Sequence, residues 1–279
     1  MMVAETQKND GVLSLINVYI TTEMQSALET PLVLPEGVTM AAALGLPVTA
    51  VQWMKAGGHV DAVVSDDHRD AGMTMLMLAG GHGHLGLVDL LIELGKPSVD
   101  FRSPARETAI LLAAAHGHPD IVQRLCHAGS KQVLQAMVQA ETRGKTEVMS
   151  VLSTHIKTVH ASLWSGAGET LPTAIATAAA YGQEASVLAW IEGGGCVDAT
   201  YSYKHEGWIE GGGCVDATYK HEGSVQDRTM LHFACEHNQA AIVNLLIKHD
   251  ADTNLQDSDG VSPLIESAWR GHASIVSRL

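Results

Sequence analysis

Residues Thr229–Asp252 read TMLHFACEHNQAAIVNLLIKHDAD and hold the pattern that decides the fold. Apolar residues follow Asn238 at four, five, eight and nine positions, namely Ile242, Val243, Leu246 and Ile247. This spacing places one apolar stripe along a helix. A shorter segment precedes Asn238 and opens at Thr229, whose hydroxyl suits the first position of a helix. The stretch therefore predicts two helices joined by a tight turn at Asn238.

The same pattern recurs along the chain, and we call the turn residue of each copy its anchor. The anchors are Gly45, Gly83, Gly117, Gly144, Gly182, Asn238 and Gly271. The hydroxyl residues expected to cap the first helices are Thr74, Thr108, Thr173, Thr229 and Ser262. The last two anchors are 33 residues apart, a period typical of solenoids in which each helix pair stacks on its neighbours. Seven helix pairs are predicted.

Segment Thr229–Asp252 resembles the ankyrin repeat family in its Thr-x-Leu-His opening, its Ile-Val-x-x-Leu-Leu helix and its Ala-Asp close. Segment Asp257–Leu279, DSDGVSPLIESAWRGHASIVSRL, is similar to the start of another copy, with an Asp-x-x-Gly hairpin and a Gly-His turn. The resemblance covers roughly residues 36–279 and implies an all-α, ankyrin-repeat solenoid of stacked helix-turn-helix units with short hairpin or loop connections. Most copies lack the Pro or His of the family's opening, so we expect these repeats to be less stable than consensus ones.

The chain is expected to divide into four parts. An N-terminal segment carries one amphipathic helix from about Val12 to Leu28, because its apolar residues recur every fourth position. A first block of repeats, a linker and a second block follow. The boundaries are 1–35 for the N-terminal segment, 36–154 for the first block, 155–172 for the linker and 173–279 for the second block. The second block breaks off inside a helix at Leu279 and is interrupted by a duplicated loop at about 200–223.

The duplication is explicit in the sequence. Trp190–Gly207 reads WIEGGGCVDATYSYKHEG, and Trp208–Gly223 repeats it without two residues. Removing one copy brings the long interval between anchors back near that of its neighbours, so the insert adds no repeat. Three interpretations stay open: slippage or a gene-model error tolerated in a loop, a functional projecting loop, and a metal site. The metal site would use Cys196, His205, Cys214 and His221, although their spacing matches no familiar zinc pattern.

Charge and composition restrict the classes of partner. Lys and Arg number 17 against 31 Asp and Glu, which gives a net charge of −14. This balance argues against nucleic acid and mildly favours a basic protein partner. No apolar run approaches the roughly 20 residues of a membrane helix, and no signal peptide is visible. The four cysteines are scattered, so a disulfide framework is not expected and the default location is the cytoplasm or nucleus.

Two motifs imitate cofactor sites. Gly81–Gly86 reads GHGHLG and satisfies G-x-G-x-x-G, but it follows a helical segment, whereas a dinucleotide fingerprint follows a strand. Arg143–Thr146 ends like a phosphate-binding loop, but Gln139 occupies the upstream glycine position. No metalloprotease or serine-hydrolase motif is present. We therefore expect no enzymatic activity, no cofactor and no metal among the repeats.

The resemblance also implies roles for residues around the anchors. Histidines 84, 118 and 272 follow an anchor, where the family implies a structural hydrogen bond at the turn. The two residues before each anchor are implied to face the concave side, where partners bind. The concave-face candidates are His82, His116, Arg143, Tyr181, Glu236, His237, Trp269 and Arg270. The hairpin-tip candidates are Asp70, Gln226, Arg228, Ser258 and Asp259. The competing interpretation is that these residues are merely solvated.

The predicted function is a non-enzymatic protein-interaction module that binds a partner protein on its concave face. A first alternative is the ankyrin segment of a larger multidomain signalling or ubiquitin-ligase adaptor. A second alternative is a metal-binding protein that uses the duplicated Cys/His loop. Fold alone does not choose the partner, because function resides in particular sites.

Overall fold

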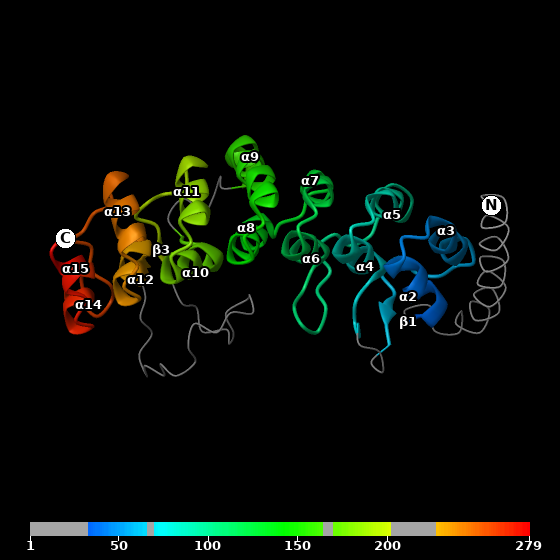
Figure 1. Ribbon diagram of the computed structural model, residues 1–279, viewed down its shortest axis with the longest axis horizontal. Helices are drawn as coiled ribbons and strands as arrows, with labels where there is room; N and C mark the ends of the chain where they lie inside the picture. The colour runs from blue at the N-terminus through cyan, green and yellow to red at the C-terminus, as the bar shows by residue number, and fades with distance from the viewer. Residues whose placement is uncertain (1–32, 66–69, 164–169, 202–226) are drawn as a thin grey trace, which may run out of the picture. The chain divides into compact units, whose positions relative to one another are not determined.

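The computed structural model describes residues 33–65, 70–163, 170–201 and 227–279 (Figure 1). The predicted helix between Val12 and Leu28 lies outside these residues. Within them the chain forms helix pairs, each joined by a tight turn at one anchor, with only short two-residue strands between pairs. The predicted all-α, helix-turn-helix class is therefore confirmed.

Seven helix pairs lie in the described part of the chain, in agreement with the seven anchors. The first helices are α2 (Glu36–Ala43), α4 (Met75–His82), α6 (Ala109–His116), α8 (Val133–Thr142), α10 (Thr173–Tyr181), α12 (Met230–Glu236) and α14 (Pro263–Trp269). The second helices are α3 (Pro47–Lys55), α5 (Leu85–Leu90), α7 (Pro119–His127), α9 (Thr146–Leu163), α11 (Glu184–Glu192), α13 (Ala240–Lys248) and α15 (Ala273–Val276). Helix α5 continues into a wider π-helical turn, η1 (Leu91–Gly95).

The helices belong to two compact units, Met1–Gln132 and Val133–Leu279. In unit 1, α4 packs between α2 and α6. In unit 2, the first helices α8, α10, α12 and α14 pack in that order, and α9, α11, α13 and α15 form a second layer (Figure 1). Within each unit, a repeat therefore covers the apolar stripe of its neighbour, as expected for a solenoid.

The core consists mainly of Ala, Leu, Ile and Val, with one tryptophan buried in each unit. Trp53 and Trp190 occupy the same position, eight residues after their anchors, and are at most 1% exposed. Each indole N–H donates to a backbone oxygen six residues later. A Cβ added to Gly195 would overlap the Trp190 ring, so this loop residue must be glycine for the backbone to cross the indole. The GGG run of the first copy thus has a packing role.

The anchor turns need a left-handed residue. Gly83 has φ 85°, and a Cβ there would lie 2.7 Å from Cε1 of His118. Glycine is therefore required both by backbone conformation and by the side chain that passes over it. Asn238 adopts φ 57°, which asparagine tolerates better than most residues. This explains why Asn can replace glycine as an anchor.

Hydroxyl caps form at three of the five predicted positions. The Thr74 hydroxyl accepts from the Met77 N–H, the Ser262 hydroxyl accepts from Ile265, and Thr229 forms a capping box with His232. The prediction is wrong for Thr108, whose buried hydroxyl has no partner, and for Thr173. Thr173 is the first residue of α10 rather than its cap, because the helix already begins after a proline.

The predicted linker at residues 155–172 differs from the structure. Helix α9 continues through His155 to Leu163, so the first half of that stretch is helical. Val148, Leu152 and Ile156 are all at most 1% exposed and keep a four-residue spacing, which buries one side of the extended helix. No Gly or Pro interrupts the helix before Leu163. Residues 164–169 lie outside the described part of the chain.

Two short strand pairs connect repeats. Strand β1 (Val33–Leu34) pairs in parallel with β2 (Val63–Val64), and β3 (Thr200–Tyr201) pairs antiparallel with β4 (Arg228–Thr229). The segment between β3 and β4 contains most of the duplicated sequence, and its residues 202–226 are not among those described. Helices α10 and α12, which flank this hairpin, still pack directly on each other. The insert therefore lies within one connection between neighbouring repeats.

Candidate functional site

The C-terminal ends of the first helices of unit 2 carry a series of large side chains. Arg143 follows α8, Tyr181 ends α10, His237 follows α12, and Trp269 and Arg270 end and follow α14. We call these five residues the pre-anchor row, because each lies one or two positions before an anchor. Since α8, α10, α12 and α14 pack in sequence, the row crosses four successive repeats of unit 2. Sequence reasoning identified all five positions.

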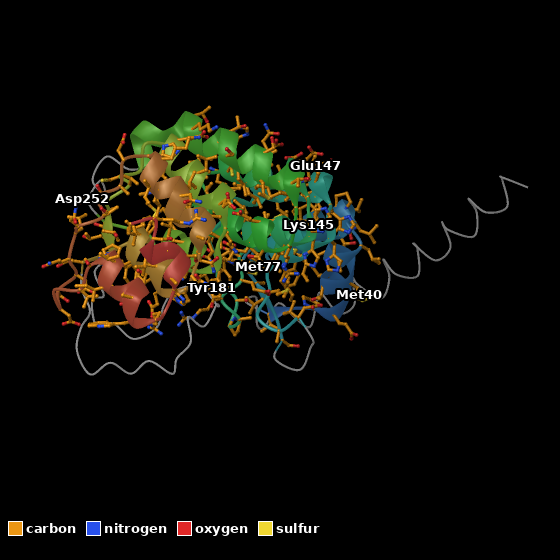
Figure 2. All side chains as sticks on the ribbon, turned by 60° about the vertical axis from the view of Figure 1, so that its left-hand side comes forward. Met40, Met77, Lys145, Glu147, Tyr181 and Asp252 are labelled. Carbon is orange, nitrogen blue, oxygen red and sulfur yellow. The ribbon has the colours of Figure 1, made fainter. Side chains whose placement is uncertain are left out.

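Aromatic groups dominate the middle and the C-terminal end of the row. The rings of Tyr181 and His237 lie 6.5 Å apart with planes tilted by 41°. His237 is oriented by a hydrogen bond between its Nδ1 and the Phe233 carbonyl, at 3.1 Å. Tyr181, labelled in Figure 2, is 50% exposed, and Trp269 is 73% exposed. The row thus presents apolar surface that no neighbouring repeat covers.

Neighbouring repeats are held in register by a recurring hydrogen bond. In each case the residue after one anchor reaches back to the residue two positions before the preceding anchor. His272 Nε2 lies 3.1 Å from the Glu236 carbonyl, and Gln239 Nε2 donates to the Ala180 carbonyl at 2.9 Å. Glutamine therefore performs the role that the resemblance implied for histidine. These bonds fix the spacing of the row.

In unit 1 the equivalent hydrogen bonds between repeats are made by histidine. His84 Nε2 lies 2.8 Å from the Ala43 carbonyl, and His118 Nε2 lies 3.2 Å from the Gly81 carbonyl. The structural turn bond expected for histidines 84, 118 and 272 is therefore confirmed, and it runs between repeats. The paired histidines resemble metal ligands in the sequence, but in the structure His84 and His118 bind backbone carbonyls.

The two concave-face candidates of unit 1 are exposed histidines. His82 Nδ1 lies 2.9 Å from the Leu78 carbonyl, and His116 Nδ1 lies 2.9 Å from the Leu112 carbonyl. Each bond assigns the proton of a neutral ring to Nδ1, which leaves Nε2 as the acceptor. His82 also stacks on His84 with ring centroids 6.3 Å apart. Both histidines are therefore oriented before any ligand binds.

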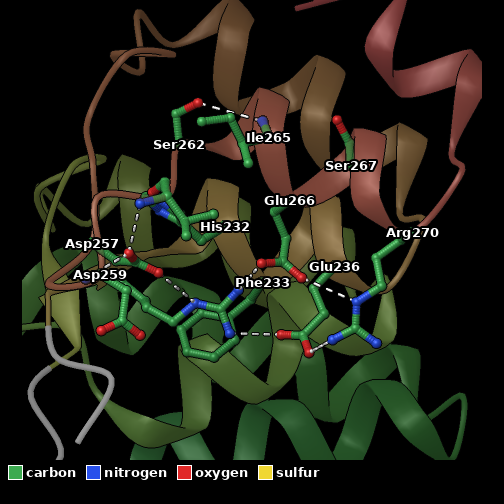
Figure 3. Close-up of polar contacts among 12 residues, drawn as sticks. His232, Phe233, Glu236, Asp257, Asp259, Ser262, Ile265, Glu266, Ser267 and Arg270 are labelled. Atoms are coloured by element: carbon green, nitrogen blue, oxygen red, sulfur yellow. Dashed lines mark hydrogen bonds and ion pairs between the residues drawn. The ribbon is translucent and has the colours of Figure 1, made fainter. Parts of the chain in front are cut away.

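Arg228, predicted at a hairpin tip, lies instead in a buried charge cluster. Figure 3 shows the carboxylates of that cluster, Glu236, Asp257 and Glu266, turned toward one another. Its side chain is only 14% exposed, and Nη1 donates to Glu236 Oε2 at 2.7 Å. Its other nitrogens lie 3.4 Å from a Glu266 oxygen and 3.8 Å from an Asp257 oxygen. The guanidinium also lies 5.1 Å from the centroid of the Phe233 ring. The Arg228 guanidinium is thus surrounded by three carboxylates and one aromatic ring and is mostly buried. The prediction that Arg228 is exposed at a hairpin tip is wrong.

Glu236, a second predicted contact residue, also belongs to this cluster. Its Oε1 accepts from Arg270 Nη2 at 2.5 Å, while its Oε2 binds Arg228. Arg270 Nε in turn donates to Glu266 Oε1 at 3.1 Å. The Glu236 side chain is 16% exposed and both of its oxygens are engaged, so its expected availability to a partner is corrected. Sequence reasoning missed the cluster, although a glutamate on the buried side of α14 was a signal that a cation lies nearby.

His232 links the cluster to the next hairpin. The side chain is fully buried; Nδ1 accepts from the Thr229 N–H at 3.1 Å, and Nε2 lies 3.1 Å from the Val261 carbonyl. Burial lowers the pKa of His232, because the charged imidazolium loses its hydration. The neutral ring, protonated on Nε2, satisfies both bonds. His232 is thus a structural element of the repeat interface.

The remaining hairpin candidates do not join the row. Ser258 and Asp259 are exposed at the turn before α14, and the Asp259 N–H donates to Asp257 Oδ1 at 3.1 Å. Asp70 is partly exposed in a separate hairpin of unit 1. Gln226 lies outside the described residues. The structure therefore brings together the concave-face candidates of unit 2 but not the hairpin-tip candidates.

These helix pairs, turns and inter-repeat bonds define a helical repeat protein of the solenoid type. A family model described as ankyrin repeats (3 copies) matches residues 38–136 and 178–279, and the chain belongs to the ankyrin repeat family. Such repeats are generally protein–protein interaction modules and typically have no enzymatic activity.

The fold also resembles solved structures. The crystal structure of the human ASB11 ankyrin repeat domain aligns with a TM-score of 0.55 and 19% identity, covering 88% of this chain and 98% of that one. At this identity the likeness establishes the fold alone. No curated protein sequence matches the chain.

The described residues were also compared with the requirements of a metal site and of a membrane-spanning helix. There, no group of three or more His, Cys, Asp or Glu side chains is arranged to hold a metal ion. Of the duplicated Cys/His set, only Cys196 is described, and the other three residues lie outside. Likewise, no helix of the described segments combines the length and apolar character needed to cross a bilayer.

Proposed function

We propose that the pre-anchor row of unit 2 binds a partner protein. The observation that carries the proposal is the exposure of Tyr181 and Trp269, 50% and 73%, at the ends of α10 and α14 in the packed series of unit 2. Only 4% of the chain is aromatic, so two large exposed rings in one row are unusual for this sequence. Tyr, Trp and Arg are the residues most often found at the energetic centres of protein interfaces.

Folding does not account for these exposed rings. The apolar residues that hold repeats together are covered on both helices of a pair, and Val243, Leu246 and Ile275 are fully buried. A residue needed for stacking would be covered by the next repeat, whereas Tyr181 stays 50% exposed although α12 packs on α10. Binding of a partner would remove that apolar surface from water, which is favourable by roughly 25 cal/mol for each Å².

Rigidity of the row supports the same function. The bonds from His272 to Glu236 and from Gln239 to Ala180 set neighbouring repeats in register before a partner arrives. A surface that is already ordered loses less conformational entropy on binding. In unit 1, His82 and His116 are also preoriented and are proposed as contacts of a second, smaller patch.

The proposed setting is the cytoplasm or nucleus, where thiols stay reduced. Cys126 and Cys235 are free and buried, and burial raises the pKa of each thiol to about 12. If the chain is the ankyrin segment of a larger adaptor, the same surface would bind the protein that the adaptor recruits.

The test compares exposed apolar residues on and off the row. Tyr181→Ala and Trp269→Ala are expected to weaken a partner, identified by affinity capture and mass spectrometry with the full chain, by at least about tenfold in Kd. Leu94→Ala is the matched control, because Leu94 is 66% exposed in η1, outside the row. Thermal unfolding should be unchanged in all three variants. If Tyr181→Ala and Trp269→Ala retain every captured partner at wild-type affinity, the row is not the binding surface.

A further inference from the structure

The residues directly before the anchors have an unusual charge composition. The seven are Leu44, His82, His116, Arg143, Tyr181, His237 and Arg270. Five of them are His or Arg, whereas the chain has only 17 Lys and Arg and 15 His in 279 residues. None is acidic, although Asp and Glu number 31. The positions directly before the anchors therefore carry cationic or neutral side chains and no carboxylate.

The N-terminal end of the row carries two cationic side chains, Arg143 and Lys145. Arg143 is exposed, and its guanidinium forms no hydrogen bond or ion pair with the described residues. Lys145, labelled in Figure 2, follows the same anchor and is partly exposed. The nearest carboxylate in sequence, Glu141, is occupied: its two oxygens accept the Ala185 N–H at 2.9 Å and the Ser186 N–H at 2.8 Å. Arg143 and Lys145 are thus available for an anionic group.

At the other end of the row the charges are already paired. Arg270 binds Glu236 and Glu266, and Trp269 beside it supplies uncovered apolar surface. Tyr181 and His237 lie between the two ends with their rings in contact range. Along the row, the chemistry therefore changes from cationic at α8 to aromatic at α10 and α14.

The spacing of the helices sets the spacing of a matching ligand. Packed helices lie about 8 to 10 Å apart, and an extended peptide advances about 3.3 Å per residue. About every third residue of an extended segment that runs across α8, α10, α12 and α14 therefore meets one member of the row. A ligand side chain opposite Arg143 would be followed about three residues on by one opposite Tyr181, and about nine residues on by one opposite Trp269.

On the basis of the proposed function, we infer that the row binds an extended acidic peptide of a partner protein. An Asp or Glu carboxylate binds Arg143 and Lys145, and apolar side chains contact Tyr181 and Trp269. The net charge of −14 favours a basic partner at long range. The Debye length is only about 8 Å at physiological ionic strength, however, so the groups in direct contact decide the preference.

One alternative explains the basic residues by folding alone. Cations are favoured at helix C-termini by the helix dipole, and all members of the row lie at such ends. That explanation predicts that replacing Arg143 lowers stability and leaves peptide binding unchanged. The acidic-peptide inference predicts the reverse, so the two are separable by measuring both quantities on the same variant.

The experiment selects ligands from a displayed library of random, unphosphorylated twelve-residue peptides on the full-length chain. The expected result is enrichment of peptides with Asp or Glu about three residues from an apolar residue. The best synthetic peptide is then measured by fluorescence anisotropy beside its Asn or Gln analogue, which should bind about tenfold more weakly. Arg143→Gln should weaken the acidic peptide similarly, and Arg143→Glu more. Lys248→Gln is the matched control, since Lys248 is exposed on α13 in the other layer.

The outcomes separate this inference from the proposed function. Selection of basic or uncharged peptides that lose affinity with Tyr181→Ala overturns the acidic ligand and leaves the row as a binding surface. Acidic peptides that bind Arg143→Glu like the wild type also overturn it, as does binding that requires a phosphorylated version of the peptide. If no selected peptide responds to either Tyr181→Ala or Arg143→Glu, both the inference and the proposed surface fail.

Discussion

Arg228 Nη1 donates to Glu236 Oε2 at 2.7 Å, which ties the hairpin that encloses the duplicated insert to helix α12. Both side chains are mostly buried, at 14% and 16% exposure, and the same arginine faces Asp257 and Glu266 from the next repeat. Strand β4 is thereby attached to two repeats at once. The insert ends before Arg228 in the sequence, and α10 still packs on α12 across it.

Replacing Arg228 should destabilise unit 2 strongly. Arg228→Met leaves three largely buried carboxylates with only Arg270 as a cation, and breaking one side of a buried ion pair typically costs about 3 to 5 kcal/mol. Urea unfolding of wild type and variant measures the difference. Lys157→Met is the control, because the Lys157–Glu192 pair is 47% and 41% exposed and is expected to contribute at most about 1 kcal/mol. Equal losses for the two variants would contradict a buried cluster.

Gly195→Ala should destabilise the chain by about 1 to 3 kcal/mol, because its methyl group would overlap the buried Trp190 ring. Tryptophan fluorescence during urea unfolding reports the change. Gly86→Ala provides the contrast: Gly86 lies inside α5 with no atom near its added Cβ, and alanine favours a helix by roughly 1 kcal/mol. A neutral Gly195→Ala would show that the loop shifts to accept the methyl group.

The bond from His272 to Glu236 should be replaceable by glutamine but not by alanine. His272→Ala removes a hydrogen bond between repeats and should cost about 0.5 to 1.5 kcal/mol. His272→Gln should recover most of that loss, since Gln239 makes the equivalent bond to Ala180. Thermal unfolding of the three proteins compares them. If both variants lose the same stability, the ring is needed for packing rather than for its hydrogen bond.

His232 should make the stability of unit 2 sensitive to mild acid. Burial lowers its pKa in the folded state below the value of about 6.5 expected for the unfolded chain. The unfolded state therefore binds the proton first, so stability is steady above about pH 6.5 and falls as the pH decreases below it. Urea unfolding between pH 7.5 and 5.5 measures the slope.

His232→Gln is the comparison for that experiment, because glutamine keeps hydrogen-bonding groups near Thr229 and Val261 without titrating. Its overall stability is expected to be lower, but its stability should change less across the same pH interval. A variant with the wild-type pH dependence would assign the effect to another group.

The positions of the proposed row could be located from the sequence because the pattern around each anchor repeats. The anchors located the helix ends beside which Tyr181, His237 and Trp269 lie, and the role of these residues in binding a partner stays a prediction. Arg228 and Glu236 were misassigned because each was judged by its place in one repeat, whereas its environment comes from the next. Likewise, nothing in the local pattern indicated that Gln239 would replace the usual histidine bond between repeats.

The sequence by itself determined the helix pairs, their turns and their order, because helix periodicity and left-handed turn residues act over a few neighbouring positions. Only the tertiary structure decided which charges are buried and which remain available to a partner. Arg228 comes from one repeat and Asp257 and Glu266 from the next, and they meet when those repeats stack, while Arg143 stays exposed. The physical reason is that burial and ion pairing depend on neighbours tens of residues away, and a local pattern of residues does not encode those distances.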